Sequence, residues 1–231
     1  MKKIGLIGGL SWVSTAEYYK RLNELTQTRC GGVSSARIVL ESVNRQVYVE
    51  AVIERRDERA ACAQILDAVR GVERAGADFV VISCNDVHRF VPEIAPQISI
   101  PFLHIAEATG VEIRKQGLGR IGLLGVRKTM EGAFYPEVFA RHGVETLTPD
   151  EDDRAYVHDT IYGELVHDRF TEETRQGYLG VIDRLARRGA EGVVLGCTEI
   201  PLLLTPEQIP IPSFSTTEIH CRAAVDMANS A

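Results

Sequence analysis

The sequence predicts an α/β protein made of two copies of one unit, each with a parallel β-sheet covered by helices on both faces. The first observation is an internal repeat: residues 76–84 (GADFVVISC) recur as residues 189–197 (GAEGVVLGC), 113 positions later (197 − 84). The second is that residues 3–8 (KIGLIG) are echoed by residues 120–125 (RIGLLG), 117 positions later (120 − 3). Short apolar runs that alternate with helical stretches are typical of buried parallel strands. We therefore interpret the chain as a duplicated α/β unit.

A third matching pair extends the repeat. Residues 97–102 (QISIPF) correspond to residues 208–213 (QIPIPS), and the two runs lead into the expected helices 104–115 and 216–227. Both copies of the unit therefore end in the same order of elements.

Two more helices are expected between the strands. Residues 50–73 carry an apolar stripe at helical spacing, and Cys62 lies on that stripe. The next begins at residues 148–151 (TPDE), where Thr148 would be the N-cap, with Pro in the first turn and Glu three residues on as in a capping box.

The repeat also predicts the domains and the place of the site. We expect a first domain of residues 1–100 plus 213–231 and a second of residues 101–212. Cys84 and Cys197 end equivalent strands, and ligands of such sheets bind beyond the carboxyl ends of the strands. If the halves are related by an approximate twofold axis, the two cysteines face each other across a cleft between the domains that fits a small molecule.

Composition limits the class of function. The 231 residues, 45% apolar and 25% charged, are ordinary for a globular protein, and the net charge of −6 argues against nucleic acid as a partner. No run approaches the ~20 apolar residues of a membrane helix. We interpret the apolar start, broken by Gly5, Gly8 and Gly9, as a strand and not as a signal peptide. Five cysteines without a CxxC pair fit a reducing cytoplasm.

Two thiols at equivalent positions favour a specific chemistry. A thiolate on one face of a carbon removes a proton, and a thiol on the other face returns one, which inverts a stereocentre without a cofactor. Polar residues follow both Cys84 and Cys197, whereas Cys30, Cys62 and Cys221 are expected to be structural.

The residues around these cysteines resemble the two signatures of the aspartate/glutamate racemase family. They are residues 84–88 (CNDVH) and 196–200 (GCTEI), and residues 7–15 (IGGLSWVST) are similar to a family run GGMSWEST. The resemblance covers essentially the whole chain. Further matching segments are residues 122–125 (GLLG), residues 129–131 (TME), Phe134 and Tyr135.

The resemblance implies two pseudo-symmetric Rossmann-like (flavodoxin-like) domains, an active site in the cleft between them, cofactor-independent racemisation of an amino acid, and a homodimer. By position, Cys197 would take the α-proton from an L-amino acid and Cys84 from the D-enantiomer. Asn85 and Thr198 would hold the α-carboxylate with backbone amides around Ser11. The expected substrate-binding residues are Leu10, Ser11, Asn85, Asp86, Val126, Thr129, Thr198 and Glu199.

Two departures from the family pattern bear on the substrate. Asp86 and Val126 stand where the family has Thr, and Val166 is not the lysine with which some aspartate-specific members read a distal carboxylate. A carboxylate ~4 Å from that of the substrate would cost about 1 kcal/mol in water and about 4 kcal/mol at a protein-like dielectric. Three arrangements relieve the clash: Asp86 is protonated, it pairs with a cation such as Arg45 or Arg127, or the substrate offers an ammonium.

Two neighbouring side chains have alternative interpretations. Asp86 orients polar groups near Cys84 as Glu199 does near Cys197, or it is a solvated acid at a helix start. His88 tunes the Cys84 thiolate, or it is a packed histidine at the start of a helix.

Other kinds of site fit the sequence poorly. The dinucleotide fingerprint needs Gly-x-Gly-x-x-Gly, whereas Gly5, Gly8 and Gly9 give Gly-x-x-Gly-Gly; an anion-binding loop before a helix near Ser14 is more economical. No lysine is placed for pyridoxal phosphate, and His88 brings Cys84 no further ligand at zinc spacing. The alternatives left open are a hydantoin racemase, another superfamily isomerase or decarboxylase, and a non-catalytic binding protein.

Overall fold

The computed structural model describes residues 1–230, which form two compact units. The first consists of residues 1–104 together with the chain from His220 onward, and the second of residues 105–219. Each unit holds one all-parallel sheet with helices packed on it, so the predicted α/β class with two parallel sheets is confirmed.

The first unit has a three-stranded sheet in the order β2-β1-β3. Its elements are β1 (Ile4–Gly8), α1 (Trp12–Cys30), β2 (Ile38–Ser42), α2 (Arg45–Val49), η1 (Glu50–Glu54), α3 (Glu58–Arg74), β3 (Phe79–Ile82), η2 (Asp86–Phe90), α4 (Val91–Ile94), η3 (Ala95–Gln97) and most of α11 (Thr216–Asn229).

The second unit has a four-stranded sheet in the order β5-β4-β6-β7. Its elements are α5 (Ile105–Lys115), β4 (Arg120–Leu124), α6 (Arg127–Glu131), α7 (Phe134–Arg141), β5 (Glu145–Leu147), α8 (Glu151–Gly163), η4 (Leu165–His167), α9 (Glu172–Arg187), β6 (Gly192–Leu195), α10 (Ile200–Leu203), η5 (Pro206–Gln208) and β7 (Ser213–Ser215).

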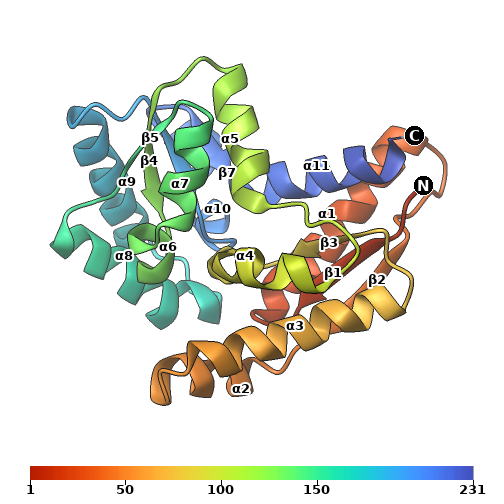
Figure 1. The fold of residues 1–231 in the computed structure, drawn as a ribbon. Helices are drawn as coiled ribbons and strands as arrows, with labels where there is room; N and C mark the ends of the chain where they lie inside the picture. The colour runs from red at the N-terminus through yellow and green to blue at the C-terminus, as the bar shows by residue number, and fades with distance from the viewer. Residues whose placement is uncertain (231) are drawn as a thin grey trace. The chain divides into compact units, whose positions relative to one another are not determined.

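Both sheets are buried on two faces, which explains why their strands are almost continuously apolar. In the first unit α3 lies against one face and α1 and α11 against the other (Figure 1). In the second unit α5 and α7 cover one face, while α8 and α9 cover the other (Figure 1). Successive strand residues point to opposite faces, so Leu6 packs with the α1 and α11 side while Ile7 packs with α3.

The register of the strands confirms the duplication. Ile4 pairs with Phe79 in the first sheet, and Ile121 pairs with Gly192 in the second. These positions are related by the two offsets of the repeat, 117 (121 − 4) and 113 (192 − 79). The third repeat pair differs in structure, because Ser213–Ser215 forms strand β7 beside β6 whereas the matching segment of the first unit adds only an isolated bridge between Val80 and Phe102.

Two predicted helix boundaries are wrong. The helix expected over residues 50–73 is broken: the backbone of Arg56 is left-handed (φ 52°), and Asp57 caps a new helix by accepting the Ala60 amide at 3.0 Å. The next helix starts after Asp150, whose carboxylate accepts the Asp153 amide at 3.1 Å, and not after Thr148. In both places a local aspartate cap overrides the longer apolar pattern.

The cysteines expected to be structural differ in burial. Cys62 and Cys221 are buried, and burial together with nearby Glu93 raises the pKa of Cys62 to about 11, which keeps it an inert thiol. Cys30 is exposed. Within residues 1–230, no helix is long and apolar enough to cross a membrane.

A histidine cluster is buried in the first unit. The Tyr18 hydroxyl lies 3.0 Å from His220 Nδ1, and His220 Nε2 lies 2.8 Å from the Leu103 carbonyl. The ring of His88 lies 4.9 Å from that of His104 and 5.5 Å from that of His220, between centroids. Burial lowers the pKa of His220 to about 4 and that of His88 well below its ordinary value, so both stay neutral at neutral pH.

This cluster makes stability depend on pH. The unfolded chain protonates His220 below about pH 6.5 while the folded chain does so only near its lowered pKa of about 4, so stability is lost as the pH falls through this window. The loss from His220 alone is about 2 kcal/mol by pH 5. His220→Gln keeps a hydrogen-bond donor and an acceptor but does not titrate. Between pH 8 and pH 5, we expect the free energy of unfolding to fall by about 2 kcal/mol less in this variant than in the parent, measured by urea denaturation. The exposed His167→Gln is the control, and equal losses in all three proteins would contradict the prediction.

Candidate active site

The two cysteines follow central strands in the same way. Ser83 donates its amide to the Ile7 carbonyl at 2.9 Å, and Gly196 donates its amide to the Leu124 carbonyl at 2.7 Å. These bonds add one rung to each sheet, so Cys84 and Cys197 are the first residues released beyond it. Both cysteines are half-buried. Each unit therefore presents a thiol at the carboxyl edge of its own sheet.

In the first unit, the loop after β1 lies beside the loop that carries Cys84. Thr15 accepts the Gly9 amide at 2.9 Å, donates to the Ser11 carbonyl at 2.8 Å, and lies 3.3 Å from the Ser83 hydroxyl. Ser11 caps α1, which begins at Trp12 and not near Ser14 as expected. The first expected substrate-binding residues, Leu10 and Ser11, therefore share an edge of the sheet with Asn85 and Asp86.

Gly9 is required for this arrangement. Its φ is +84°, and a Cβ there would lie 2.1 Å from the Val43 carbonyl oxygen. Only glycine tolerates both conditions, so it fixes how the loop after β1 passes the end of β2.

His88 holds the backbone of the cysteine loop. Its Nδ1 lies 2.8 Å from the carbonyl oxygen of Cys84, to which the neutral ring donates. The side chain is fully buried, and its Nε2 is without a hydrogen-bond partner. This geometry agrees with a packed histidine at the start of a helix and gives it a role in positioning the Cys84 backbone.

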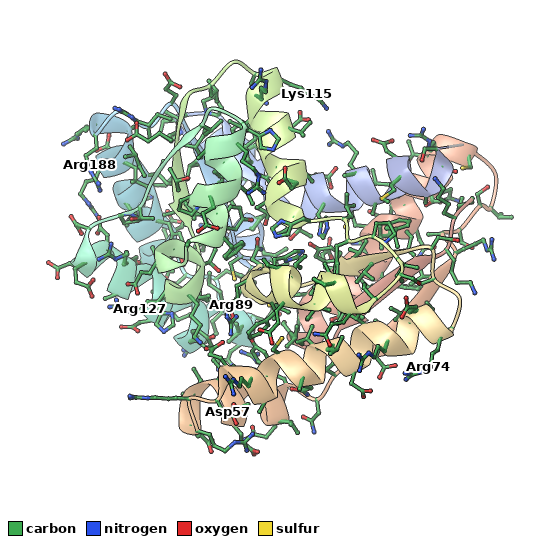
Figure 2. The ribbon with its side chains drawn as sticks, viewed as in Figure 1. Asp57, Arg74, Arg89, Lys115, Arg127 and Arg188 are labelled. Carbon is green, nitrogen blue, oxygen red and sulfur yellow. The ribbon has the colours of Figure 1, made fainter. Side chains whose placement is uncertain are left out.

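Asp86 belongs to a network of four side chains. Its Oδ2 accepts from the Tyr48 hydroxyl at 3.0 Å and lies 2.5 Å from Arg89 Nη1, while Arg89 Nη2 lies 2.8 Å from Glu58 Oε2. Figure 2 labels Arg89, whose guanidinium reaches Glu58 at the start of α3. Burial and the charge of Asp86 raise the pKa of Tyr48 far above its ordinary value, so the phenol stays protonated.

Of the three arrangements proposed for Asp86, the structure shows pairing with a cation, and that cation is Arg89, which the sequence analysis did not name. Arg127 lies in the second unit and is paired with Glu131 at 2.9 Å and Glu151 at 2.7 Å. The sequence contained a clue to this pair, because Arg89 stands three residues after Asp86 and side chains at that spacing lie on one face of a helical turn. Sequence reasoning also missed Tyr48, because 38 residues separate it from Asp86.

In the second unit a carboxylate contacts the cysteine directly. The Cys197 thiol donates to Glu199 Oε2 at 2.9 Å, and the Thr198 hydroxyl donates to the same oxygen at 2.7 Å. Glu199 is 3% exposed. A buried carboxylate at hydrogen-bond distance from a thiol can accept its proton or orient it.

The remaining expected residues lie on the neighbouring loop. Val126 precedes α6, and its carbonyl accepts the Thr129 amide at 2.8 Å. Thr129 is fully buried, and its Oγ1 is without a hydrogen-bond partner. The loops after β4 and β6 pass close together, since a Cβ on Gly125 would lie 3.0 Å from the Gly196 carbonyl oxygen. Val126, Thr129, Thr198 and Glu199 thus share the edge that carries Cys197.

The arrangement of possible donor side chains bears on metal binding. Across the described part of the chain, no group of three or more His, Cys, Asp or Glu side chains is arranged to hold a metal ion. The histidines near Cys84 are packed face to edge and bonded to backbone carbonyls.

Comparison with known proteins defines the class. The fold matches a candidate Asp/Glu racemase from Yersinia pestis over 100% of both chains, with 40% identity and a TM-score of 0.93. It also matches an aspartate racemase homologue from Pyrococcus horikoshii over 100% of both chains, with 27% identity and a TM-score of 0.87. The fold is that of an α/β isomerase of the racemase class.

The family follows from the sequence. Residues 7–224 match the family described as Asp/Glu/Hydantoin racemase, which is nearly the whole chain. The protein belongs to this racemase family, as its signatures predicted. Among curated relatives, it is 22% identical over 225 residues to the broad specificity amino-acid racemase RacX of Bacillus subtilis, covering 96% of each chain.

The close approach at the end of β6 gives a test of the backbone geometry. A Cβ on Gly196 would lie 2.7 Å from the Leu124 carbonyl oxygen, so Gly196→Ala must shift backbone at the cysteine loop. We expect it to lower the free energy of unfolding by about 1–3 kcal/mol in chemical denaturation. Gly163→Ala, where a Cβ meets nothing within 4 Å, is the matched control and should be neutral or stabilising. Equal stability of the two variants would argue against the close approach.

Proposed function

We propose that the protein is a cofactor-independent amino-acid racemase in which Cys84 and Cys197 exchange the α-proton of one substrate. The observation that carries the proposal is the placement of two thiols at repeat-equivalent positions, each one rung beyond a central strand, in a chain of a racemase family. Relatives named for amino-acid, aspartate and glutamate racemisation support an amino acid as the substrate.

In the proposed mechanism the thiolate of one cysteine takes the α-proton and becomes a thiol. The carbanion-like intermediate is planar at the α-carbon and is protonated on its other face by the second thiol, which becomes the thiolate. Cys197 acts as the base toward the L-enantiomer and Cys84 toward the D-enantiomer. One turnover exchanges the two protonation states, so the product complex is ready for the reverse reaction.

The polar residues near each cysteine are assigned to the polar groups of the substrate. Asn85 and Thr198, with backbone amides near Leu10 and Ser11, would hold the α-carboxylate. The unpartnered, buried hydroxyl of Thr129 supports a role as a further contact to a polar ligand group, because such groups in proteins are normally hydrogen-bonded. We further propose a cytoplasmic homodimer that takes a small-molecule amino acid and no nucleic acid.

Deuterium exchange tests the two-base chemistry. In deuterium oxide the parent protein should wash out the α-proton of its amino acid and racemise it, followed by NMR and chiral chromatography. Cys84→Ala should lose racemisation but still exchange the α-proton of the L-enantiomer, and Cys197→Ala should exchange only the D-enantiomer. Cys30→Ser, at an exposed thiol, should behave as the parent. Two-way racemisation by Cys84→Ala would overturn the scheme, and exchange of hydantoins alone would transfer the proposal to hydantoin racemisation.

Glu199 is proposed to accept or orient the Cys197 proton. We expect Glu199→Gln to lower kcat from the L-enantiomer at least tenfold, since positioned proton-transfer groups contribute roughly 10²–10⁴-fold. Glu191→Gln is the control, because this exposed carboxylate lies in the same unit and accepts backbone amides of Gly119 and Arg120. An unchanged kcat with normal binding would remove Glu199 from the proton path.

A further inference from the structure

The network around Asp86 is built to present one carboxylate oxygen. Asp86 lies two residues after Cys84, and its side chain is 13% exposed. Oδ2 is bound by both the Tyr48 hydroxyl and Arg89 Nη1, whereas Oδ1 is buried and without a hydrogen-bond partner. A buried carboxylate oxygen in this state is unfavourable unless a donor arrives.

Arg89 is fully engaged and is not a reader of a substrate carboxylate. Its Nη1 donates to the Tyr48 oxygen at 3.1 Å and to the Asp86 carbonyl at 3.0 Å, while Nε and Nη2 donate to Glu58 at 3.2 and 2.8 Å. Its guanidinium also lies 4.1 Å over the ring of Phe90. The nitrogen atoms of the guanidinium are therefore bonded within the protein, and one face of the group lies over Phe90.

The charge of the network is negative. Two carboxylates, Asp86 and Glu58, share one guanidinium, and Tyr48 adds no charge because burial and Asp86 hold its pKa far above neutrality. Glu58 is 48% exposed and screened by solvent, so the less exposed Asp86 dominates beside Cys84. A substrate group that approaches Oδ1 is favoured if it is a cation and disfavoured if it is an anion.

We infer that Asp86 Oδ1 accepts an ammonium group of the substrate, that Tyr48 and Arg89 are its positioning residues, and that the enzyme prefers neutral or basic amino acids over acidic ones. This inference rests on the proposed racemase function and adds its substrate class. It explains why Asp86 stands where the family has Thr, because the aspartate would select the substrate. The ammonium is either the α-ammonium, common to all amino acids, or a side-chain ammonium of a basic one.

The test compares alanine, lysine and glutamate as substrates by deuterium exchange in the parent and in Asp86→Asn, which keeps the size and removes the charge. Losing a charged hydrogen bond should raise KM by roughly 10- to 100-fold. If the α-ammonium is bound, KM rises for alanine, lysine and glutamate alike; if the side-chain ammonium is bound, it rises for lysine alone. Asp86→Thr should raise the relative kcat/KM for glutamate.

The positioning residues need a readout that a purely structural role would not move. Tyr48→Phe removes the hydroxyl that donates to Asp86 Oδ2 and accepts from Arg89 Nη1, and it should raise KM by roughly fivefold with little change in kcat. L-lactate, which has a hydroxyl in place of the α-ammonium of alanine, is the binding probe measured by calorimetry. If the α-ammonium is bound, Asp86→Asn should weaken alanine but not lactate. The exposed Asp67→Asn is the matched control.

Three results overturn the inference. The first is that the parent turns over glutamate as efficiently as alanine and lysine, and that the kcat/KM ratios among the three substrates are unchanged in Asp86→Asn. The second is a uniform fall in kcat and melting temperature without any change in KM ratios, which would make Asp86 a structural residue. Neither of these two results would contradict the proposed racemase function. The third is no exchange of any amino acid by the parent, which would remove the proposed function and this inference with it.

Discussion

The parallel pairing of β1 with β3, and of β4 with β6, is the constraint on which the rest of the structure depends. The last pairs, Ile7 with Ile82 and Leu124 with Leu195, make the strands of each pair end together. The chain therefore leaves both strands at one edge, and side chains far apart in sequence meet there. One additional amide hydrogen bond after each strand extends the sheet by one residue, and the next residue is a cysteine in both units.

The cysteine loops of the two units share a backbone arrangement but differ in their polar chemistry. Glu199 bonds the Cys197 thiol directly, whereas the equivalent Asp86 is turned into a network with Tyr48 and Arg89. The difference comes from the side chains of the surrounding elements, since Tyr48 lies on α2, which follows β2, and Arg89 lies on η2, which follows β3. A duplicated fold thus supplies equivalent thiols, and differences in sequence between the two copies supply different surroundings.

The repeat was enough to predict the two parallel sheets, the central strands β1, β3, β4 and β6, and a cysteine just beyond β3 and β6, because buried strands leave a continuous apolar pattern. The break at Arg56 escaped prediction because a single left-handed residue and an aspartate cap leave the apolar stripe of the helix intact. Long-range pairs such as Tyr48 with Asp86 escaped it because one sequence does not say which loops meet in space. The histidine cluster escaped for the same reason, as His88 and His220 are 132 residues apart in the chain (220 − 88).

The unlike surroundings of Cys84 and Cys197 have a thermodynamic consequence for a racemase. Enantiomers have equal free energy in water, so the equilibrium constant of the reaction is unity and kcat/KM must be equal in the two directions. A carboxylate that contacts one thiol and a guanidinium network beside the other cannot favour either product. The asymmetry can change KM and kcat for each enantiomer, but only in such a way that kcat/KM stays equal in the two directions.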